Sequence, residues 1–211
     1  MNAAELRINT DGGFRERFGA WVFVVQRKEE GHAGPLHVVA GKADDTMPAS
    51  HQPMEVTAAL MAVQWLKCHR STVTGTIDSD SNYVVKSANV DYLKWEARNW
   101  RRADGKPVMY QELWRPLLED LSALHPRPRF VLIPRRSNKK ADALCTLVLK
   151  ACHPGCITKT WDQVANAVRR AFEDCPKAVS EGLIEQVGRE VTETSEPRVW
   201  NFYCAPNGGT T

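Results

Sequence analysis

The amino-acid sequence predicts a mixed α/β (α+β) domain, a five-stranded mixed sheet flanked by helices, with a small and mainly helical C-terminal extension. Two observations predict the domain. Apolar residues alternate with polar ones, or run continuously, in short segments bounded by turn-forming residues, which is typical of strands. Between later strand-like segments, apolar residues recur at a spacing of three and four, which is typical of helices.

Three strand-like segments open the chain. Residues 5–10 alternate apolar and polar side chains, as in a strand with one solvent-facing side, whereas residues 19–26 are almost wholly apolar and indicate a central strand. Residues 36–40 form the third. Because the segments between them are rich in turn-forming residues, we expect an antiparallel meander, followed by a loop over residues 44–53.

Helices and strands then alternate. Residues 54–67 have helical spacing and carry Glu55 in the first turn. Residues 72–78 form a strand that a helical crossover should place parallel to the first strand, and it leads to Asp80 and to a helix that Ser81 could cap. The remaining elements are a helix over residues 110–124, a strand over residues 129–134 and a helix over residues 138–150.

Length and charge suggest one domain and a polyanionic partner. A chain of 211 residues that is 43% hydrophobic allows one well-buried domain of about 150 residues, residues 1–152, plus an extension, residues 153–211. Residues 160–211 hold five Lys/Arg and eight Asp/Glu, so the net charge of +3 divides into +6 before residue 160 and −3 after it. The basic body favours a polyanion such as nucleic acid.

The sequence gives no sign of export or of membrane contact. No segment approaches the ~20 apolar residues that cross a bilayer, and the first residues do not resemble a leader. We expect a soluble, cytoplasmic protein with reduced cysteines and no small-molecule cofactor. Cys152 and Cys156 flank a histidine, but without a second well-spaced ligand pair they do not indicate zinc.

Four carboxylates lie where strands end or helices begin. Asp11 and Asp80 end neighbouring strands, and Glu55 and Asp142 open helices. Such positions gather at one edge of an α/β sheet, so the four side chains could converge. Clustered like charges repel unless cations lie among them, and oxygen-only ligands select Mg²⁺ or Mn²⁺. Two such ions about 4 Å apart can activate water and stabilise the leaving oxygen of a phosphodiester.

A basic segment precedes the helix expected over residues 110–124. Residues 89–106 interleave two tryptophans with five cations, namely Lys94, Trp95, Arg98, Trp100, Arg101, Arg102 and Lys106. Two interpretations stay open: an exposed surface for a polyanion, or a small helix packed by the two indoles.

Four fragments in register carry a family resemblance. They are Thr10-Asp11-Gly12-Gly13, Pro53-Met54-Glu55, Asp80-Ser81-Asn82-Tyr83-Val84 and Asn138-Lys139-Lys140-Ala141-Asp142-Ala143-Leu144. Residues 4–152 thereby resemble type 1 ribonuclease H. The resemblance implies a ribonuclease H-like fold and a two-metal-ion endonuclease that hydrolyses the RNA strand of RNA/DNA hybrids, leaving 5′-phosphate and 3′-hydroxyl ends. It implies two Mg²⁺ ions, with Mn²⁺ as a substitute, and Asp11, Glu55, Asp80 and the more adaptable Asp142 as catalytic metal ligands.

The resemblance also implies a nucleic-acid-binding surface. Residues 95–108 resemble the basic handle that grips the DNA strand in this family, and residues 50–52 fall where members bind a DNA phosphate and the minor groove. The chain lacks the histidine loop of many members, and the cations after residue 134 could replace its phosphate contacts. The implied contacts are Gly12, Gly13, Ser50, His51, Gln52, Asn82, Trp95, Arg98, Trp100, Arg101, Arg102, Lys106, Arg135 and Arg136.

Other functions stay open. A 3′–5′ exonuclease of the same fold would usually carry an acid where this chain has Gly13, and a non-catalytic nucleic-acid-binding module would normally have lost a carboxylate. In the extension, residues 160–174 and 178–191 have helical spacing and residues 197–203 could be a strand. Packing on the body is its simplest role, and binding a protein partner is the second.

Overall fold

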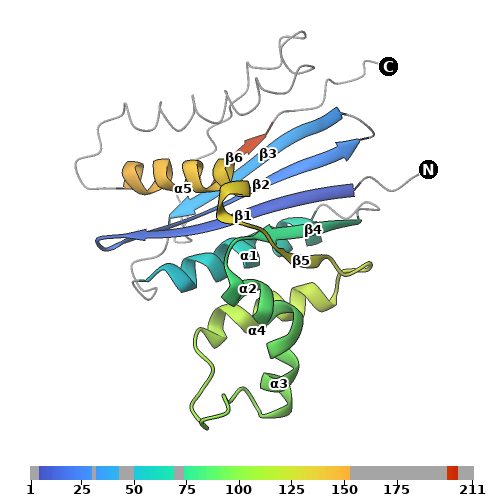
Figure 1. Cartoon of the computed structure of the whole chain (residues 1–211), viewed down its shortest axis with the longest axis vertical. Coiled ribbons are helices and arrows are strands. Elements are labelled where there is room, and N and C mark those ends of the chain that lie inside the picture. The colour runs from blue at the N-terminus through green and yellow to red at the C-terminus, as the bar shows by residue number, and fades with distance from the viewer. Residues whose placement is uncertain (1–4, 30–31, 43–49, 69–73, 153–198, 204–211) are drawn as a thin grey trace.

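The computed structural model describes residues 5–29, 32–42, 50–68, 74–152 and 199–203 (Figure 1). In these ranges one mixed sheet is covered by helices on both faces. The C-terminal helix α5 (Lys139–Cys152) contacts β1, β2 and β3 on one face. The long helix α1 (His51–Cys68) packs on the other face, and α4 (Gln111–Ser122) packs against α1.

The sheet has the strand order β5-β4-β1-β2-β3-β6. The first three strands form the predicted antiparallel meander, and β4 and β5 add to β1 in parallel, as a crossover through α1 predicts. The five strands of the prediction are therefore confirmed, and a sixth from the extension lengthens the sheet. The strands are β1 (Glu5–Arg15), β2 (Phe18–Glu29), β3 (His32–Lys42), β4 (Thr74–Ser79), β5 (Arg129–Leu132) and β6 (Val199–Tyr203).

Short helices connect β4 to α4. Ser81 caps the first of them as predicted, since its Oγ accepts a hydrogen bond from the Val84 N–H at 3.4 Å. These short helices are α2 (Asn82–Lys86), the π-helical turn η1 (Ser87–Asp91) and α3 (Tyr92–Ala97). Further along the chain, a 3-10 turn, η2 (Arg135–Ser137), leads from β5 into α5.

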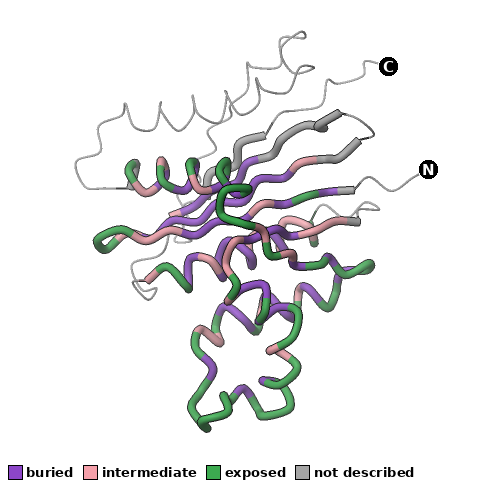
Figure 2. Tube along the Cα trace, viewed as in Figure 1, coloured by how far each residue is buried: buried purple, intermediate pink, exposed green. Residues whose placement is uncertain are grey.

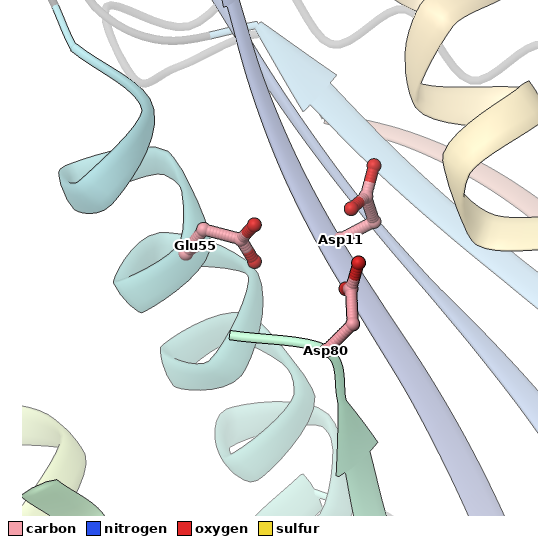
Figure 3. A group of neighbouring side chains, drawn as sticks. All are labelled: Asp11, Glu55 and Asp80. Carbon is pink, nitrogen blue, oxygen red and sulfur yellow. The ribbon is translucent and has the colours of Figure 1, made fainter. Parts of the chain in front are cut away.

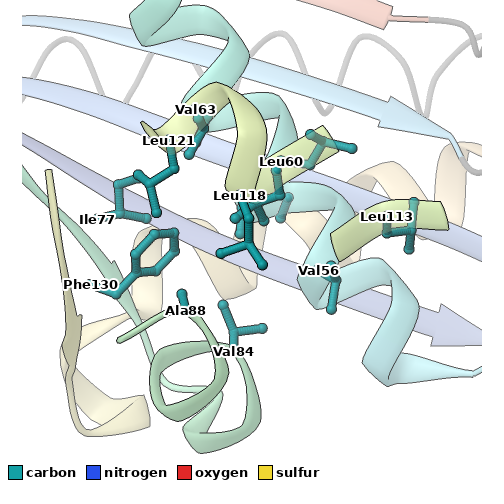
Figure 4. Close-up of a cluster of buried hydrophobic side chains, with 14 of the residues drawn as sticks. Val56, Leu60, Val63, Ile77, Val84, Ala88, Leu113, Leu118, Leu121 and Phe130 are labelled. Carbon is teal, nitrogen blue, oxygen red and sulfur yellow. The ribbon is translucent and has the colours of Figure 1, made fainter. Parts of the chain in front are cut away.

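The hydrophobic core fills the space between the sheet and the helices α1, α2 and α4 (Figure 4). Leu6 and Ile8 of β1 point into it, so the intervening residues of β1 face α5. Trp114 of α4 is completely buried, and burial of one such large apolar side chain stabilises the fold by about 1.5–3 kcal/mol. The strands are buried along their centres, and the segment after α3 is exposed except at Trp100 and Val108 (Figure 2).

Two predicted boundaries next to the acidic residues were wrong. β1 does not end at Asp11 but continues to Arg15, because β2 pairs with its whole length through a tight turn in which Glu16 adopts a φ of 60°. Helix α1 begins at His51 rather than at residue 54, because proline is tolerated in a first helical turn and Pro53 does not exclude one. Glu55 consequently lies beyond the first turn of α1.

Only part of the extension can be compared with the sequence. The strand expected over residues 197–203 is confirmed as β6, which pairs antiparallel with β3. The two expected helices and the segment 153–156 lie outside the described residues, so the domain boundary after residue 152 stays a prediction. Within the described part of the chain, no helix is both long and apolar enough to span a membrane.

Candidate active site

Three of the four predicted carboxylates meet at one point (Figure 3). Asp11 comes from β1, Glu55 from α1 and Asp80 from the residue after β4, and one ligand oxygen of each lies within 4.8 Å of the other two. The parallel pairing of β1 with β4 ends at Thr10 and Ser79. The residue after each of these two is an aspartate, so both carboxylates lie at the point where β1 and β4 separate.

Gly12 allows α1 to approach β1 closely enough to deliver Glu55. A Cβ atom at Gly12 would lie 2.2 Å from the backbone N of Glu55, a distance that no side chain tolerates. Gly13 faces the other way, where a Cβ atom would lie 2.7 Å from Leu149 Cδ1 of α5. Both glycines are therefore required by packing on opposite sides of β1, and their contact with nucleic acid stays a prediction.

The three carboxylates are electrostatically crowded. Burial, then the charges of Asp11 and Asp80, raise the pKa of Glu55 from 4.5 to about 9, against a hydrogen bond from the Gly12 backbone N–H that lowers it. Burial and then Asp80 raise the pKa of Asp11 from 3.8 to about 6. Glu55 Oε2 is buried and has no hydrogen-bond partner among the described residues. One buried and two half-buried carboxylates whose charges repel one another fit a hard divalent cation.

Asn138 contacts this cluster through a buried side chain that donates a hydrogen bond to Asp80. Its side chain is 1% exposed, and its Nδ2 donates hydrogen bonds of 2.9 Å to the Thr10 carbonyl and to Asp80 Oδ1. Its Oδ1 accepts one from Asn9 Nδ2 at 3.4 Å. Asn138 thus ties β1, the end of β4 and the start of α5 together. From the sequence alone, Asn138 is identifiable only as a helix start, although asparagine before a helix is a typical N-terminal cap with a polar side chain.

Asp142 lies beside the group of three and not within it. Its Oδ1 accepts a hydrogen bond from Arg135 Nη2 at 2.7 Å, and the Arg135 side chain is 80% exposed. The Asp142 charge still raises the pKa of Asp11, and the Arg135 guanidinium lowers the pKa values of both Asp11 and Glu55. One exposed cation therefore stands at the edge of the acidic cluster, next to the fourth predicted ligand.

Cys145 is a neighbour of the cluster that the sequence analysis missed. The single S–H of its buried thiol is shared between two acceptors, the Ala20 carbonyl at 3.6 Å and the Asp11 carboxyl, and the hydrogen bond to Asp11 lowers the pKa of that carboxyl. Burial and the nearby acids raise the pKa of the thiol well above its ordinary value, so it stays protonated and acts as a donor. No motif in the sequence points to this cysteine, because the contact depends on α5 packing against β1.

The two tryptophans of the basic segment belong to the core. Trp95 and Trp100 are each 9% exposed, and the Trp95 ring packs on Trp114 with centroids 5.5 Å apart. The packed alternative of the sequence analysis is therefore what the structure has, and the indoles support the segment from inside. Arg115 lies 4.3 Å above the Trp100 ring and covers it from outside.

The cations of the segment remain at the surface. The residues after α3 form a short hairpin, in which Arg102 N donates to the Lys106 carbonyl at 2.8 Å and Gly105 adopts a φ of 77°. Arg101 Nη1 donates to the Gly105 carbonyl at 2.9 Å, and Arg102 pairs with Asp104 at 3.1 Å. The exposed cations of the handle are Arg98, Arg101, Arg102 and Lys106.

The other predicted contacts lie around the starts of α1, α2 and α5. Ser50 Oγ lies 3.3 Å from the Tyr110 hydroxyl, and His51 Nδ1 accepts a hydrogen bond from the Phe14 N–H at 3.3 Å. The first contact connects the start of α1 to the start of α4, and the second connects it to the end of β1. The remaining predicted contacts are exposed, namely Gln52, Asn82 and Arg136.

A mixed sheet in this order, with acids from its central strand, from the crossover helix and from the end of the next strand, defines a ribonuclease H-like nuclease domain. The RNase H family model matches residues 3–128, and the chain belongs to that family. Ribonuclease H of Thiobacillus denitrificans is 35% identical over 125 residues, 59% of this chain and 78% of that relative. Ribonuclease H of Bordetella pertussis is 32% identical over 130 residues, 58% and 84% of the two chains.

Solved structures share the fold. The crystal structure of LC9-RNase H1, a type 1 RNase H, matches with a TM-score of 0.56 and 17% identity over 72% of this chain and 75% of that one. A foamy viral protease-reverse transcriptase in complex with an RNA/DNA hybrid matches with a TM-score of 0.52 and 20% identity. The match covers 68% of this chain and 19% of that chain. The predicted fold and family are confirmed, whereas the loss of a histidine loop stays a prediction. The family is divalent-metal dependent, and the three-carboxylate cluster could hold such an ion.

Proposed function

We propose that this ribonuclease H cleaves the RNA strand of RNA/DNA hybrids as an endonuclease, with Asp11, Glu55 and Asp80 as its central catalytic residues. One observation carries the assignment: three carboxylates from three elements offer ligand oxygens within 4.8 Å of one another. Burial, and then their mutual repulsion, raises the pKa values of Asp11 and Glu55, so the site favours a bound cation over three free charges.

The donor set suits Mg²⁺, with Mn²⁺ as a substitute, because all the ligand atoms are carboxylate oxygens. Two such ions, when bound, supply an activated water and stabilise the leaving oxygen of the phosphodiester. Asp11, Glu55 and Asp80 would hold them, and Asp142 would complete the set. Asn138 keeps Asp80 in place through the 2.9 Å hydrogen bond, and the Gly12 N–H does the same for Glu55.

Substrate binding would use the exposed residues around the site. In this proposal the four handle cations contact DNA phosphates, with Trp95 and Trp100 holding the handle in shape. Residues at the starts of α1 and α2 and the two glycines of β1 would face the minor groove and the RNA 2′-hydroxyl. Arg135 and Arg136 would contact the phosphates next to the cleaved bond. The cytoplasmic location and a protein partner for the extension remain predictions.

Cleavage of a labelled RNA/DNA hybrid in Mg²⁺ tests the assignment. Asp11→Asn should lower the cleavage rate at least about 10³-fold, because it removes a ligand and a charge that act in the transition state. Glu119→Gln, which neutralises an exposed acid on α4, should leave the rate unchanged. Equal cleavage by wild type and Asp11→Asn would reject the site. Salt-sensitive binding of the hybrid without cleavage would indicate a non-catalytic binding module instead.

A further inference from the structure

The base of the handle is organised around the backbone carbonyl of Trp100. Asn99 and Trp100 have φ angles of 48° and 61°, in the left-handed region that is uncommon for residues other than glycine. The Trp100 carbonyl accepts hydrogen bonds from the Val108 backbone N–H at 2.9 Å and from Gln111 Nε2 at 3.1 Å. An uncommon backbone conformation persists where surrounding contacts over-determine it. The first turn of α4, which carries Gln111, therefore helps to fix the shape of the handle.

Arg115 of α4 completes this set of contacts. It lies one turn after Gln111 on the same face of the helix, and its Nη2 donates a hydrogen bond of 3.1 Å to Gln111 Oε1. Its guanidinium carbon lies 4.3 Å from the centroid of the Trp100 ring. The Arg115 side chain is thus restrained from two sides. An arginine that is restrained before binding loses less conformational entropy when it contacts a ligand.

The positive charge of Arg115 has no carboxylate partner among the residues that the structure describes. Both of its side-chain contacts are with neutral groups, an amide oxygen and an indole ring. Arg102 in the neighbouring hairpin differs, because it pairs with Asp104 at 3.1 Å. Arg115 is exposed, although the ring that it covers is buried. Because a guanidinium has several N–H donors and Gln111 takes one, the others remain able to donate to an anion.

The start of α4 connects two groups of predicted substrate contacts. Gln111 binds the base of the handle through the Trp100 carbonyl. Tyr110, the residue before it, has its hydroxyl 3.3 Å from Ser50 Oγ, at the start of the helix that carries Glu55. A polyanion that contacts both groups would pass the first turns of α4, where Arg115 is exposed.

We propose that Arg115 is a further nucleic-acid-binding residue, which donates to a backbone phosphate of the hybrid, and that Gln111 is the positioning residue that holds its guanidinium. The inference rests on the proposed function, because it takes the hybrid as the ligand. A guanidinium suits this role since its planar N–H donors match two phosphate oxygens. The sequence pattern did not indicate Arg115, because it lies in an amphipathic helix outside the basic segment.

Fluorescence anisotropy of a labelled RNA/DNA hybrid with the full chain in EDTA tests the contact without cleavage. Arg115→Ala should weaken binding about tenfold and reduce the slope of log Kd against log salt by about one, because one phosphate contact is lost. Arg115→Lys should keep the slope and weaken binding about threefold, because lysine retains the charge without the planar donors. Arg129→Ala removes an exposed cation from β5 and should change the affinity less than about twofold.

Gln111→Ala separates positioning from charge. It should weaken binding about threefold with an unchanged salt slope, and raise KM with kcat nearly unchanged, because the Arg115 charge is retained but no longer held. Wild-type affinity of Gln111→Ala would reject the positioning role.

An unchanged salt slope for Arg115→Ala would overturn the proposed contact. A lower free energy of unfolding of that variant in urea, without a change in slope, would show that Arg115 only covers Trp100. Absence of hybrid binding by the wild type would overturn the contact as well. The Asp11→Asn assay decides cleavage separately, so a wild type that cleaves the hybrid while Arg115→Ala keeps its salt slope rejects this contact and leaves the proposed function intact.

Discussion

Asn138 shows how one buried side chain can hold a carboxylate of the acidic cluster in place. It joins the Thr10 carbonyl, 128 positions away in the sequence, to Asp80 Oδ1 through a single amide nitrogen. Since Asp80 follows the end of β4 and has no strand partner, this amide restrains a carboxylate that the sheet itself does not hold.

Substitution of Asn138 should affect stability and cleavage together. Asn138→Ala removes its buried hydrogen bonds and should lower the free energy of unfolding by about 1–3 kcal/mol, measured by urea denaturation. Its hybrid cleavage should also fall, because Asp80 is no longer fixed. Asn138→Asp places a like charge 2.9 Å from Asp80 and should lower cleavage further. Ser137→Ala, at an exposed neighbour, is the control; a wild-type rate for Asn138→Ala would refute the role.

The residue types in the sequence were sufficient to predict the carboxylates of the cluster. They were not sufficient to predict the residues that hold these carboxylates by hydrogen bonds. Asp11, Glu55 and Asp80 could be predicted because acids at strand ends and helix starts have few structural reasons to be there. Asn138 and Cys145 could not be predicted as supports of the cluster, because their roles depend on which distant residues they contact. Those contacts follow from the packing of α5 on β1, which no local pattern records.

At the scale of elements, the handle combines a packed interior with a charged surface. Trp95, Trp100 and Trp114 pack together, and the hairpin after α3 presents its cations outward. The sequence pattern gave both features but did not assign the indoles, because tryptophans among charges suit an exposed surface as well as a small core. The tertiary contact with α4 decides between them.

The handle should contribute to the affinity for the hybrid and to its salt dependence, and not to the rate of the cleavage step. Arg101→Ala with Arg102→Ala should raise KM for the hybrid about tenfold with kcat nearly unchanged, and reduce the slope of log KM against log salt by about two, one for each lost phosphate contact. Steady-state kinetics at several salt concentrations provide the test. Arg129→Ala with Lys150→Ala controls for net charge. An unchanged salt slope in the handle variant would place the DNA strand elsewhere.

The end of strand β1 also could not be predicted from the local sequence pattern. β1 continues through Asp11, Gly12 and Gly13 because β2 pairs with it to the end, although glycines usually weaken a strand. The glycines are tolerated since α1 and α5 press on both sides of β1. The order of helices and strands could be predicted, whereas the length of β1 depended on its neighbours.

Across the whole molecule, the fold concentrates negative charge at one partly buried point within a basic body. Residues 1–159 carry a net charge of +6, yet three acids share one site between the sheet and α1. Metal-free protein keeps protons on this site: the folded pKa values of Asp11 and Glu55, about 6 and about 9, exceed their ordinary values of 3.8 and 4.5. Their stabilising contribution is therefore complete below about pH 4 and is lost as the pH rises through about 6 and about 9.

Thermal unfolding of the full chain between about pH 5 and about pH 9, in EDTA and in Mg²⁺, tests the central claim most directly. In EDTA the difference in Tm between Glu55→Gln and wild type should grow in favour of the variant as the pH rises, because the variant has no carboxylate to ionise. At alkaline pH, Mg²⁺ should raise the Tm of wild type by about 2–4 °C for each kcal/mol of binding free energy and leave Glu55→Gln nearly unchanged. Equal responses of the two proteins to Mg²⁺ and to pH would contradict the account.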